Sequence, residues 1–211
     1  MALDNYDNLK EAIKDFSHRN DITTRLDDFI QLAEQEMYAN QVEPLRIRDM
    51  EQTSSSDTST SVRTLALPTG FEQIRSITID DKSSDAQPYE LLYRTPETLP
   101  ISNAAGTPVF FSVTSQIEFE RVPDAVYNID IIYFGSLTGL SDANTTNAVL
   151  TNYPSIYLSG ALWALYQWSM QLDLADYHYN RFIGAIKGAN LSTDLGRHGP
   201  APTIAFDGEV V

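Results

Sequence analysis

The side chains with the widest range of chemistry are three histidines, His18, His178 and His198. A histidine can act as a general base or bind a metal when a suitable partner lies beside it. Asp176 is two residues from His178, a separation that points the two side chains to different faces of a helix. His18 lies between two predicted helices. The histidines therefore predict neither a catalytic pair nor a metal site.

Two pairs of adjacent acids, Asp27-Asp28 and Asp80-Asp81, are the other candidates for catalysis. The first pair lies in a predicted helix, and the second lies where a strand is expected to turn, a common position for aspartate. A small β-rich hydrolase or lyase is the alternative hypothesis, and it requires such acids to converge in a pocket.

Sequence motifs of the common enzyme classes are missing from the chain. It contains no GxSxG, P-loop, GxGxxG or HExxH pattern. It also contains no cysteine, which excludes a disulfide, a thiolate nucleophile and a cysteine-bound metal. We expect a protein that is not an enzyme and that needs no cofactor and no metal.

The charge balance restricts the classes of partner. The 211 residues carry a formal net charge of −15, and their 42% hydrophobic content is typical of a folded globular protein. A groove that grips DNA or RNA needs clustered Lys and Arg, whereas the basic residues here are scattered. The acidity indicates either simple solubility or a surface that must not bind nucleic acid passing nearby.

Residues 143–172 contain no charged side chain. Several polar residues and the absence of flanking Lys or Arg argue against a membrane span. Pro154 suits the first turn of a helix that is apolar on all sides, and such a helix must be buried on all sides. In a chain of this size, we expect one side of it to meet another subunit. The predicted interface residues are Tyr157, Trp163, Tyr166 and Trp168, because Tyr and Trp are favoured at such contacts.

Hydrophobic periodicity predicts two helices at the N-terminal end, over residues 5–17 and about 22–40, and two at the C-terminal end. The last helix is expected over about 173–187, with Leu174, Tyr177, Phe182 and Ile186 facing inward. Between them, alternating residues predict strands at 45–50, 63–67, 74–80, 89–94, 108–113, 116–121 and 127–135, and a Ser/Thr-rich loop or hairpin tip at 51–62.

The predicted fold class is α+β. A helical bundle formed by residues 1–44 and 145–190 is interrupted by a β-rich insertion at 45–140. Residues 191–211 have no helical period and are expected to form an extended C-terminal arm.

Five segments, in this order, resemble adaptor proteins of tailed bacteriophages, of the kind found in short-tailed phages. They are LALPTGFEQIRSITID, YELLYRTPETLP, TPVFFSV, IEFERVPDAVYNIDIIYFGSLTGLSD and NAVLTNYPSIYLSGALWALYQW. Each motif is short, and it is their order and spacing that carry the resemblance, over about residues 62–190.

The resemblance implies a structural virion protein at the junction of head and tail, assembled in the host cytoplasm. Such adaptors form a ring, commonly of twelve copies, between the portal protein and the tail nozzle or tail tube. Genomic DNA passes through the ring without specific binding, no membrane is involved, and tail fibres are a further candidate partner. The arm is implied to contact the portal or a neighbouring subunit through Leu191, Leu195, Arg197, Ile204 and Phe206.

A tail accessory module that binds the host or a glycan is the alternative function. It would use Tyr89, Tyr93, Phe110 and Phe111 as a stacking surface, although aromatic residues also favour strands for packing alone.

Overall fold

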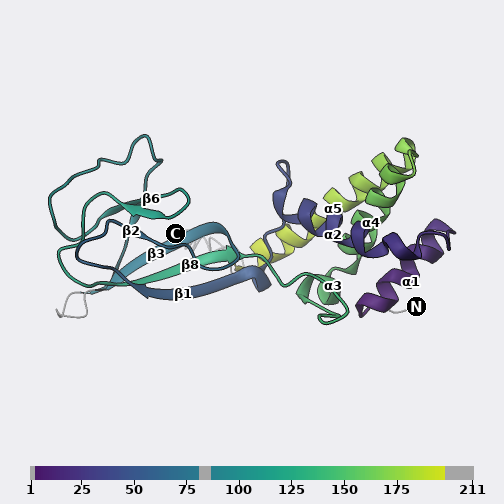
Figure 1. Cartoon of the computed structure of the whole chain (residues 1–211), viewed down its shortest axis with the longest axis horizontal. Helices are drawn as coiled ribbons and strands as arrows, with labels where there is room; N and C mark the ends of the chain where they lie inside the picture. Colours follow the sequence, from purple (N-terminus) through teal and green to yellow (C-terminus); the bar gives the residue numbers. More distant parts are fainter. Residues whose placement is uncertain (1–2, 81–86, 198–211) are drawn as a thin grey trace, which may run out of the picture. The chain divides into compact units, whose positions relative to one another are not determined.

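The computed structural model describes residues 3–80 and 87–197 and confirms the α+β class. The chain divides into two compact units (Figure 1). Unit 1 comprises Met1–Arg48 together with Thr138–Val211, and unit 2 comprises Asp49–Leu137. Both ends of the chain therefore contribute to the helical unit, and the strands lie between them in sequence.

Unit 1 is helical in its described part. Polar side chains begin two of its helices: the Asn5 side chain accepts the Asn8 N–H at 2.9 Å, and the Asn147 side chain accepts the Leu150 N–H at 3.0 Å. The helices are α1 (Tyr6–Ser17), α2 (Leu26–Ala39), α3 (Ala148–Asn152), α4 (Pro154–Trp168) and α5 (Leu172–Arg197), and a short 3-10 helix, Thr23–Arg25, precedes α2.

Helix α4 is the central element of unit 1, since α1, α2, α3 and α5 all pack against it. It lies very close to two of its neighbours at Gly160. A Cβ atom at this position would lie 2.8 Å from the Ala33 Cβ of α2 and 2.9 Å from the Phe182 ring of α5. The missing side chain of Gly160 therefore lets three helices meet at one point.

The segment before the first strand corrects the prediction of a strand at 45–50. Leu45 and Ile47 are fully buried, as their alternation predicted, but residues 45–47 have no sheet partner. The Arg46 N–H donates instead to the Asn190 side chain at 2.7 Å, and Arg48–Met50 form a 3-10 turn. The alternating pattern therefore reflects the burial of Leu45 and Ile47, and these residues do not belong to a β-sheet.

Unit 2 is built of two four-stranded sheets. All strand pairs are antiparallel except β5 with β6. The first sheet has the order β1 (Glu51–Asp57), β8 (Asn128–Gly135), β3 (Phe71–Asp80) and β4 (Tyr89–Glu90), and the second has β2 (Thr64–Leu65), β7 (Ile117–Phe119), β6 (Phe110–Val113) and β5 (Leu92–Tyr93).

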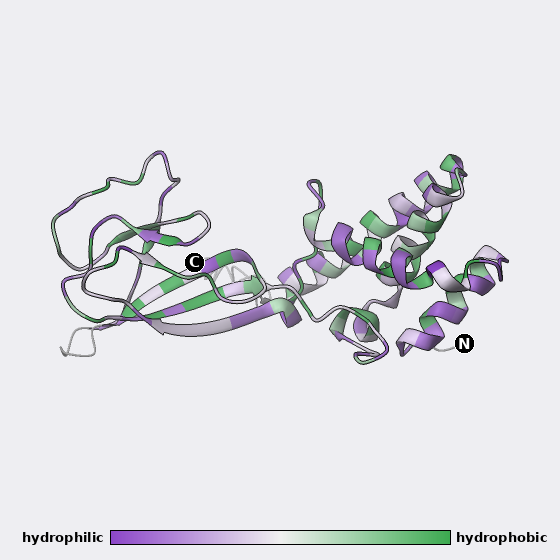
Figure 2. Ribbon diagram, viewed as in Figure 1, coloured by the Kyte–Doolittle hydropathy of each residue, from purple (hydrophilic) through white to green (hydrophobic). Residues whose placement is uncertain are grey.

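Both sheets contribute to one hydrophobic core. Apolar residues recur along β3 and β8 (Figure 2) and pack with Phe111 and Phe119 of the second sheet. Alternate residues of β8, such as Ile129 and Ile131, are fully buried, which is the period-two pattern of a strand with one covered face. The two sheets therefore pack face to face.

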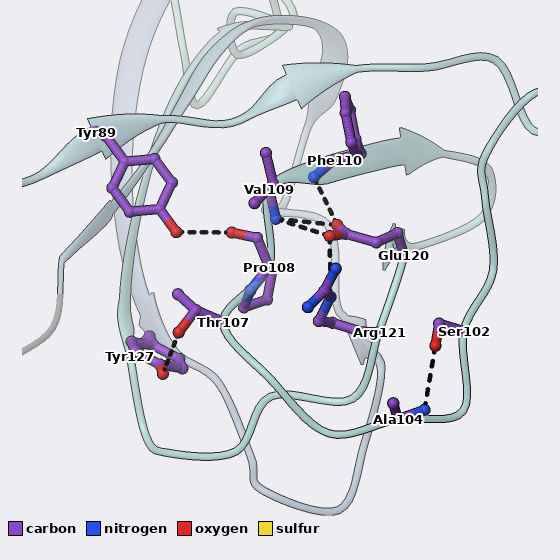
Figure 3. Close-up of polar contacts among 10 residues, drawn as sticks. All are labelled: Tyr89, Ser102, Ala104, Thr107, Pro108, Val109, Phe110, Glu120, Arg121 and Tyr127. Carbon is purple, nitrogen blue, oxygen red and sulfur yellow. Dashed lines mark hydrogen bonds and ion pairs between the residues drawn. The ribbon is translucent and has the colours of Figure 1, made fainter.

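A buried carboxylate fixes the start of β6 (Figure 3). Glu120 is 2% exposed, and its oxygens accept the Val109 N–H at 2.9 Å and the Phe110 N–H at 2.5 Å. The Arg121 guanidinium lies 3.1 Å from the same carboxylate. These bonds satisfy an acid that would otherwise be costly to bury.

The predicted loop at 51–62 is wrong for its first half. Residues 51–57 form β1, which pairs with β8 in a continuous register from Glu51–Phe134 to Asp57–Asn128. A backbone ladder does not require apolar side chains, so the polar composition concealed the strand.

The predicted strand at 89–94 is divided between the two sheets. At Leu91, which is 2% exposed, the chain leaves β4 and enters β5. The Leu91 N–H donates to Ile77 of the first sheet at 2.8 Å, and the Leu92 N–H donates to Val109 at 2.9 Å.

The predicted boundary of the arm is also wrong, because α5 continues to Arg197. Thr193 is buried, and its hydroxyl oxygen lies 3.4 Å from the Arg48 N–H. Residues 191–197 therefore belong to a helix, and the rest of the predicted arm lies outside the described residues.

A matched pair of glycine substitutions tests the packing of α4. Gly160→Ala should lower the free energy of unfolding by about 1–3 kcal/mol, because its Cβ would overlap α2 and α5. Gly184→Ala in α5, where a Cβ would meet nothing within 4 Å, should raise it by about 0.5–1 kcal/mol. Denaturant unfolding of both variants measures the difference, and equal effects would contradict the close approach at Gly160.

Candidate interaction surface

Tyr157 is a core residue, and this corrects its prediction as an interface residue. It is 1% exposed, and its hydroxyl donates to Glu34 Oε1 at 2.7 Å while accepting the Asn147 side-chain N–H at 2.7 Å. The Leu140 N–H donates to the same Glu34 oxygen at 2.7 Å. One carboxylate oxygen thus joins α2, α4 and the segment that returns from unit 2.

The position of Glu34 raises the pKa of its carboxyl above the ordinary range, because burial disfavours the charged form. The hydrogen bonds from Leu140 and Tyr157 act in the opposite direction and are the smaller effect. In turn, burial and the adjacent Glu34 charge raise the pKa of the Tyr157 hydroxyl far above its ordinary value. Both groups serve the structure of unit 1.

Trp163 and Tyr166 are largely covered by α5. The Trp163 ring stacks on Phe182, with centroids 6.4 Å apart, and contacts Tyr179 at 5.4 Å. Tyr166 is 8% exposed and stacks on His178 at 5.2 Å. These aromatic groups bind the hairpin of α4 and α5 together, and Trp163 keeps only part of its surface open.

Trp168 is the predicted interface residue that the structure leaves most open. Half of it is exposed, and its ring has Phe29 at 5.8 Å and the Arg19 guanidinium at 5.3 Å. Met170 and Leu172 follow in the turn, with 81% and 62% of their surface exposed. We call Trp168, Met170 and Leu172 the hairpin tip.

The hairpin tip borders a surface hollow of about 490 Å³, lined by residues 170–174. Met170 takes a left-handed backbone conformation, with φ of 58°, which ends the hairpin turn and turns the chain into α5. Sequence reasoning missed Met170 and Leu172 because they follow the last aromatic residue of the predicted helix. The sequence feature that could have identified them is the uncharged stretch, which continues to Leu172.

A second open apolar surface runs along α5. Leu174 and Tyr177 were predicted to face inward, and this is wrong: they are 42% and 54% exposed. Phe182 and Ile186 are fully buried, as predicted. We define the outer face of α5 as the exposed residues that recur at intervals of three and four, which are Leu174, Tyr177, Arg181, Gly184, Gly188, Leu191 and Leu195.

The residues predicted to form contacts of the arm fall into two groups. Leu191 and Leu195 lie on the outer face of α5, 60% and 68% exposed, and Arg197 ends the helix. Ile204 and Phe206 lie outside the described residues. The predicted contacts are therefore helical residues wherever the structure describes them.

Asp27 and Asp28 bind different partners, and Asp81 of the second predicted acid pair lies outside the described residues. Asp27 accepts the Tyr6 hydroxyl at 2.9 Å and pairs with Lys10 at 2.8 Å, whereas Asp28 pairs with Arg25 at 3.4 Å. The Lys10 and Tyr6 bonds lower the pKa of Asp27 despite its partial burial. Asp27 is held as a structural anion between α1 and α2.

Neither of the two described histidines belongs to a group of side chains that could hold a metal ion. His18 ends α1 in the left-handed conformation, and His198 lies outside the described residues. Burial and the nearby Arg181 charge lower the pKa of His178. Among residues 3–80 and 87–197, no group of three or more His, Asp or Glu side chains could hold a metal ion. No helix of the described part is both long and apolar enough to cross a membrane.

The aromatic residues of the alternative glycan hypothesis do not form one platform. Phe111 is 2% exposed and belongs to the core, where the Tyr93 ring meets it edge-on at 5.7 Å. Tyr89 lies in the other sheet, and its hydroxyl donates to the Pro108 carbonyl at 2.8 Å (Figure 3). Tyr93 and Tyr89 keep about half and 40% of their surface exposed.

A family comparison gives the context of these exposed apolar residues. The family model described as SU10 adaptor protein matches residues 4–203. The chain belongs to this family. A search of curated proteins found no match. Membership identifies an adaptor-type structural protein of a phage particle, which associates with other virion components.

Substitutions of Glu34 separate its hydrogen bonds from its charge. In the adaptor, Glu34→Ala should lower the free energy of unfolding by about 2–4 kcal/mol, because the Tyr157 hydroxyl and the Leu140 N–H lose their acceptor. Glu34→Gln should cost much less, since its amide oxygen can replace Oε1 and accept both bonds.

The Glu34→Gln variant also tests the raised pKa of the Glu34 carboxyl. The folded state binds the Glu34 proton more tightly than the unfolded state, so this group lowers the free energy of unfolding as pH rises from the ordinary glutamate range through the raised pKa. Glu34→Gln removes that contribution. Urea unfolding of both proteins between about pH 4 and 8 should therefore show the variant gaining relative stability as pH rises. A constant difference would contradict the raised pKa.

Proposed function

We propose that the adaptor forms a ring, commonly twelve copies in such proteins, between the portal protein and the tail nozzle of a short-tailed phage. Family membership supports the location in the neck of the particle, and the amount of open apolar surface on unit 1 supports assembly. In this proposal the chain has no catalytic activity, and its arm beyond Arg197 contacts the portal or a neighbouring subunit.

The proposal assigns the acidity of the chain to the DNA channel. Of the basic residues in helices α1 and α2 and the turn between them, Lys10, Lys14, Arg19 and Arg25 are each paired with an acid. Little free positive charge remains there to hold a phosphate backbone. Such a surface lets the genome slide during packaging and ejection.

The hairpin tip is the observation that supports docking to a second virion protein. Trp168, Met170 and Leu172 are each at least half exposed, Met170 and Leu172 line the hollow, and Met170 is the most exposed large hydrophobic residue in the described part of the chain. Exposed apolar side chains of this kind contribute to binding because a partner removes their surface from water.

The mass of the adaptor alone and mixed with its portal tests the proposal directly. Native mass spectrometry or mass photometry should show many adaptor copies on each portal ring. Adaptor chains that neither form a ring nor bind the portal at high concentration would overturn it.

A single substitution tests the hairpin tip. Met170→Asp should weaken binding to the portal or nozzle at least about tenfold, because it places a charge in the apolar contact. Aspartate tolerates the left-handed conformation of this position, so the fold should be kept. Val42→Asp, at another exposed apolar residue of unit 1, is the matched control and should bind normally. Equal binding by both variants would show that the hairpin tip is not part of the contact with the portal or nozzle.

A further inference from the structure

Helix α5 carries two separate stripes at heptad-like spacing, and only one of them is buried by other residues that the structure describes. The inner stripe packs in unit 1 and is buried at Ala175, Phe182, Ile186, Ala189 and Thr193. The outer face of α5, defined above, is exposed over its whole length of about 32 Å. Spacings of three and four along a helix are typical of a seam that packs against another helix.

The shape of the outer face suits a partner helix. Leucine and tyrosine side chains lie toward its two ends, and Gly184 and Gly188 lie near its centre. A Cβ atom at either glycine would meet nothing within 4 Å, so the backbone of α5 is open to close approach there. Because the two glycines have no side chain, a second helix can cross α5 at a short distance there, and the apolar residues toward both ends can pack against it.

Two cations lie near the centre of the outer face, Arg181 on it and Lys187 beside it, and neither has an acidic partner among the described residues. Arg181 donates a hydrogen bond to the Tyr177 hydroxyl at 3.3 Å, and neither Arg181 nor Lys187 forms an ion pair with a described residue. In a chain with a net charge of −15, two such cations on one helix favour an acidic occupant.

An acidic face of suitable form lies on α1. Asp7, Glu11 and Asp15 follow one another at intervals of four and are exposed, so they share one side of the helix. Asp7 and Asp15 have no ion pair within the described part of the chain. Phe16, 60% exposed, adds an apolar group beside Asp15.

The two faces lie on different sides of unit 1. α1 and α5 each pack against α4, which lies between them (Figure 1). The outer face of α5 therefore cannot reach the acidic face of α1 in its own chain. A closed ring requires complementary surfaces on two sides of each subunit, and these two faces meet that requirement.

Pairing of two outer faces with each other is disfavoured. An antiparallel pair centred on Gly184 would place Arg181 of one copy opposite Lys187 of the other on both sides of the centre, and like charges repel. The charge pattern therefore favours pairing of the outer face of α5 with the acidic face of α1.

We propose that the outer face of α5 binds the acidic face of α1 in a neighbouring copy of the chain, head to tail. Arg181 and Lys187 face Asp7, Glu11 and Asp15 of that copy, and the exposed leucines and Tyr177 close the contact around them. This contact rests on the ring proposed above and identifies the faces that build it.

A charge swap tests the contact. Arg181→Glu with Lys187→Glu reverses the α5 face, and Asp7→Lys with Asp15→Lys reverses the α1 face. Each double variant alone should lose ring assembly, at least about tenfold by mass photometry with and without portal. An equimolar mixture of the two should assemble again, because every α5 face then meets a complementary α1 face. One chain carrying all four substitutions should also assemble.

Controls separate folding from association. Circular dichroism and thermal unfolding should match the wild type for each variant, and Arg48→Glu, an exposed charge reversal off both faces, should assemble normally. Should the α5 variant fail to fold, Leu191→Asp on the same face replaces it, with loss of assembly expected.

The outcomes distinguish the contact from the ring. Wild-type rings together with undiminished assembly of the α5 variant, or with no rescue in the mixture, would overturn the contact and leave the ring proposal standing. Wild-type chains that form no ring with or without portal would overturn both.

Discussion

The burial of α4 is the constraint on which unit 1 depends. A helix without a charged side chain must be covered on every side, and four other helices supply that cover. Gly160 sets how close they come, and the Glu34 carboxylate joins α4 to α2 and to the returning chain through one oxygen. The exposed apolar residues of the hairpin tip and of the outer face of α5 remain outside this packing.

The sequence predicted the fold class and the uncharged helix because both depend on long, consistent patterns. It placed Tyr157 at an interface because tyrosine chemistry does not tell a hydroxyl bonded to Glu34 from one that meets a partner. It placed Leu174 and Tyr177 inward because two interleaved stripes on one helix look like one broad stripe. It missed β1 because a ladder of backbone bonds can be built on serine and threonine.

Charge is distributed in the adaptor by two different rules. Buried acids are satisfied by backbone donors, as Glu120 is by Val109 and Phe110 and as Glu34 is by Leu140. The cations of α1 and of the turn before α2, which are Lys10, Lys14, Arg19 and Arg25, are paired with acids close in space. Against this background the unpaired cations of α5 stand out, since exposed ion pairs contribute little to stability and their absence there has little cost to the fold.

The discontinuity of unit 1 has a consequence for synthesis on the ribosome. The apolar stripes of α1 and α2 leave the ribosome first, yet α4, which covers them, is separated from them by the whole of unit 2. Unit 2 is one continuous segment, residues 49–137, whereas unit 1 needs both ends of the chain. We therefore expect unit 2 to fold first during synthesis, and the contacts of Phe29 and Ala33 with α4 to form only after α4 has been made.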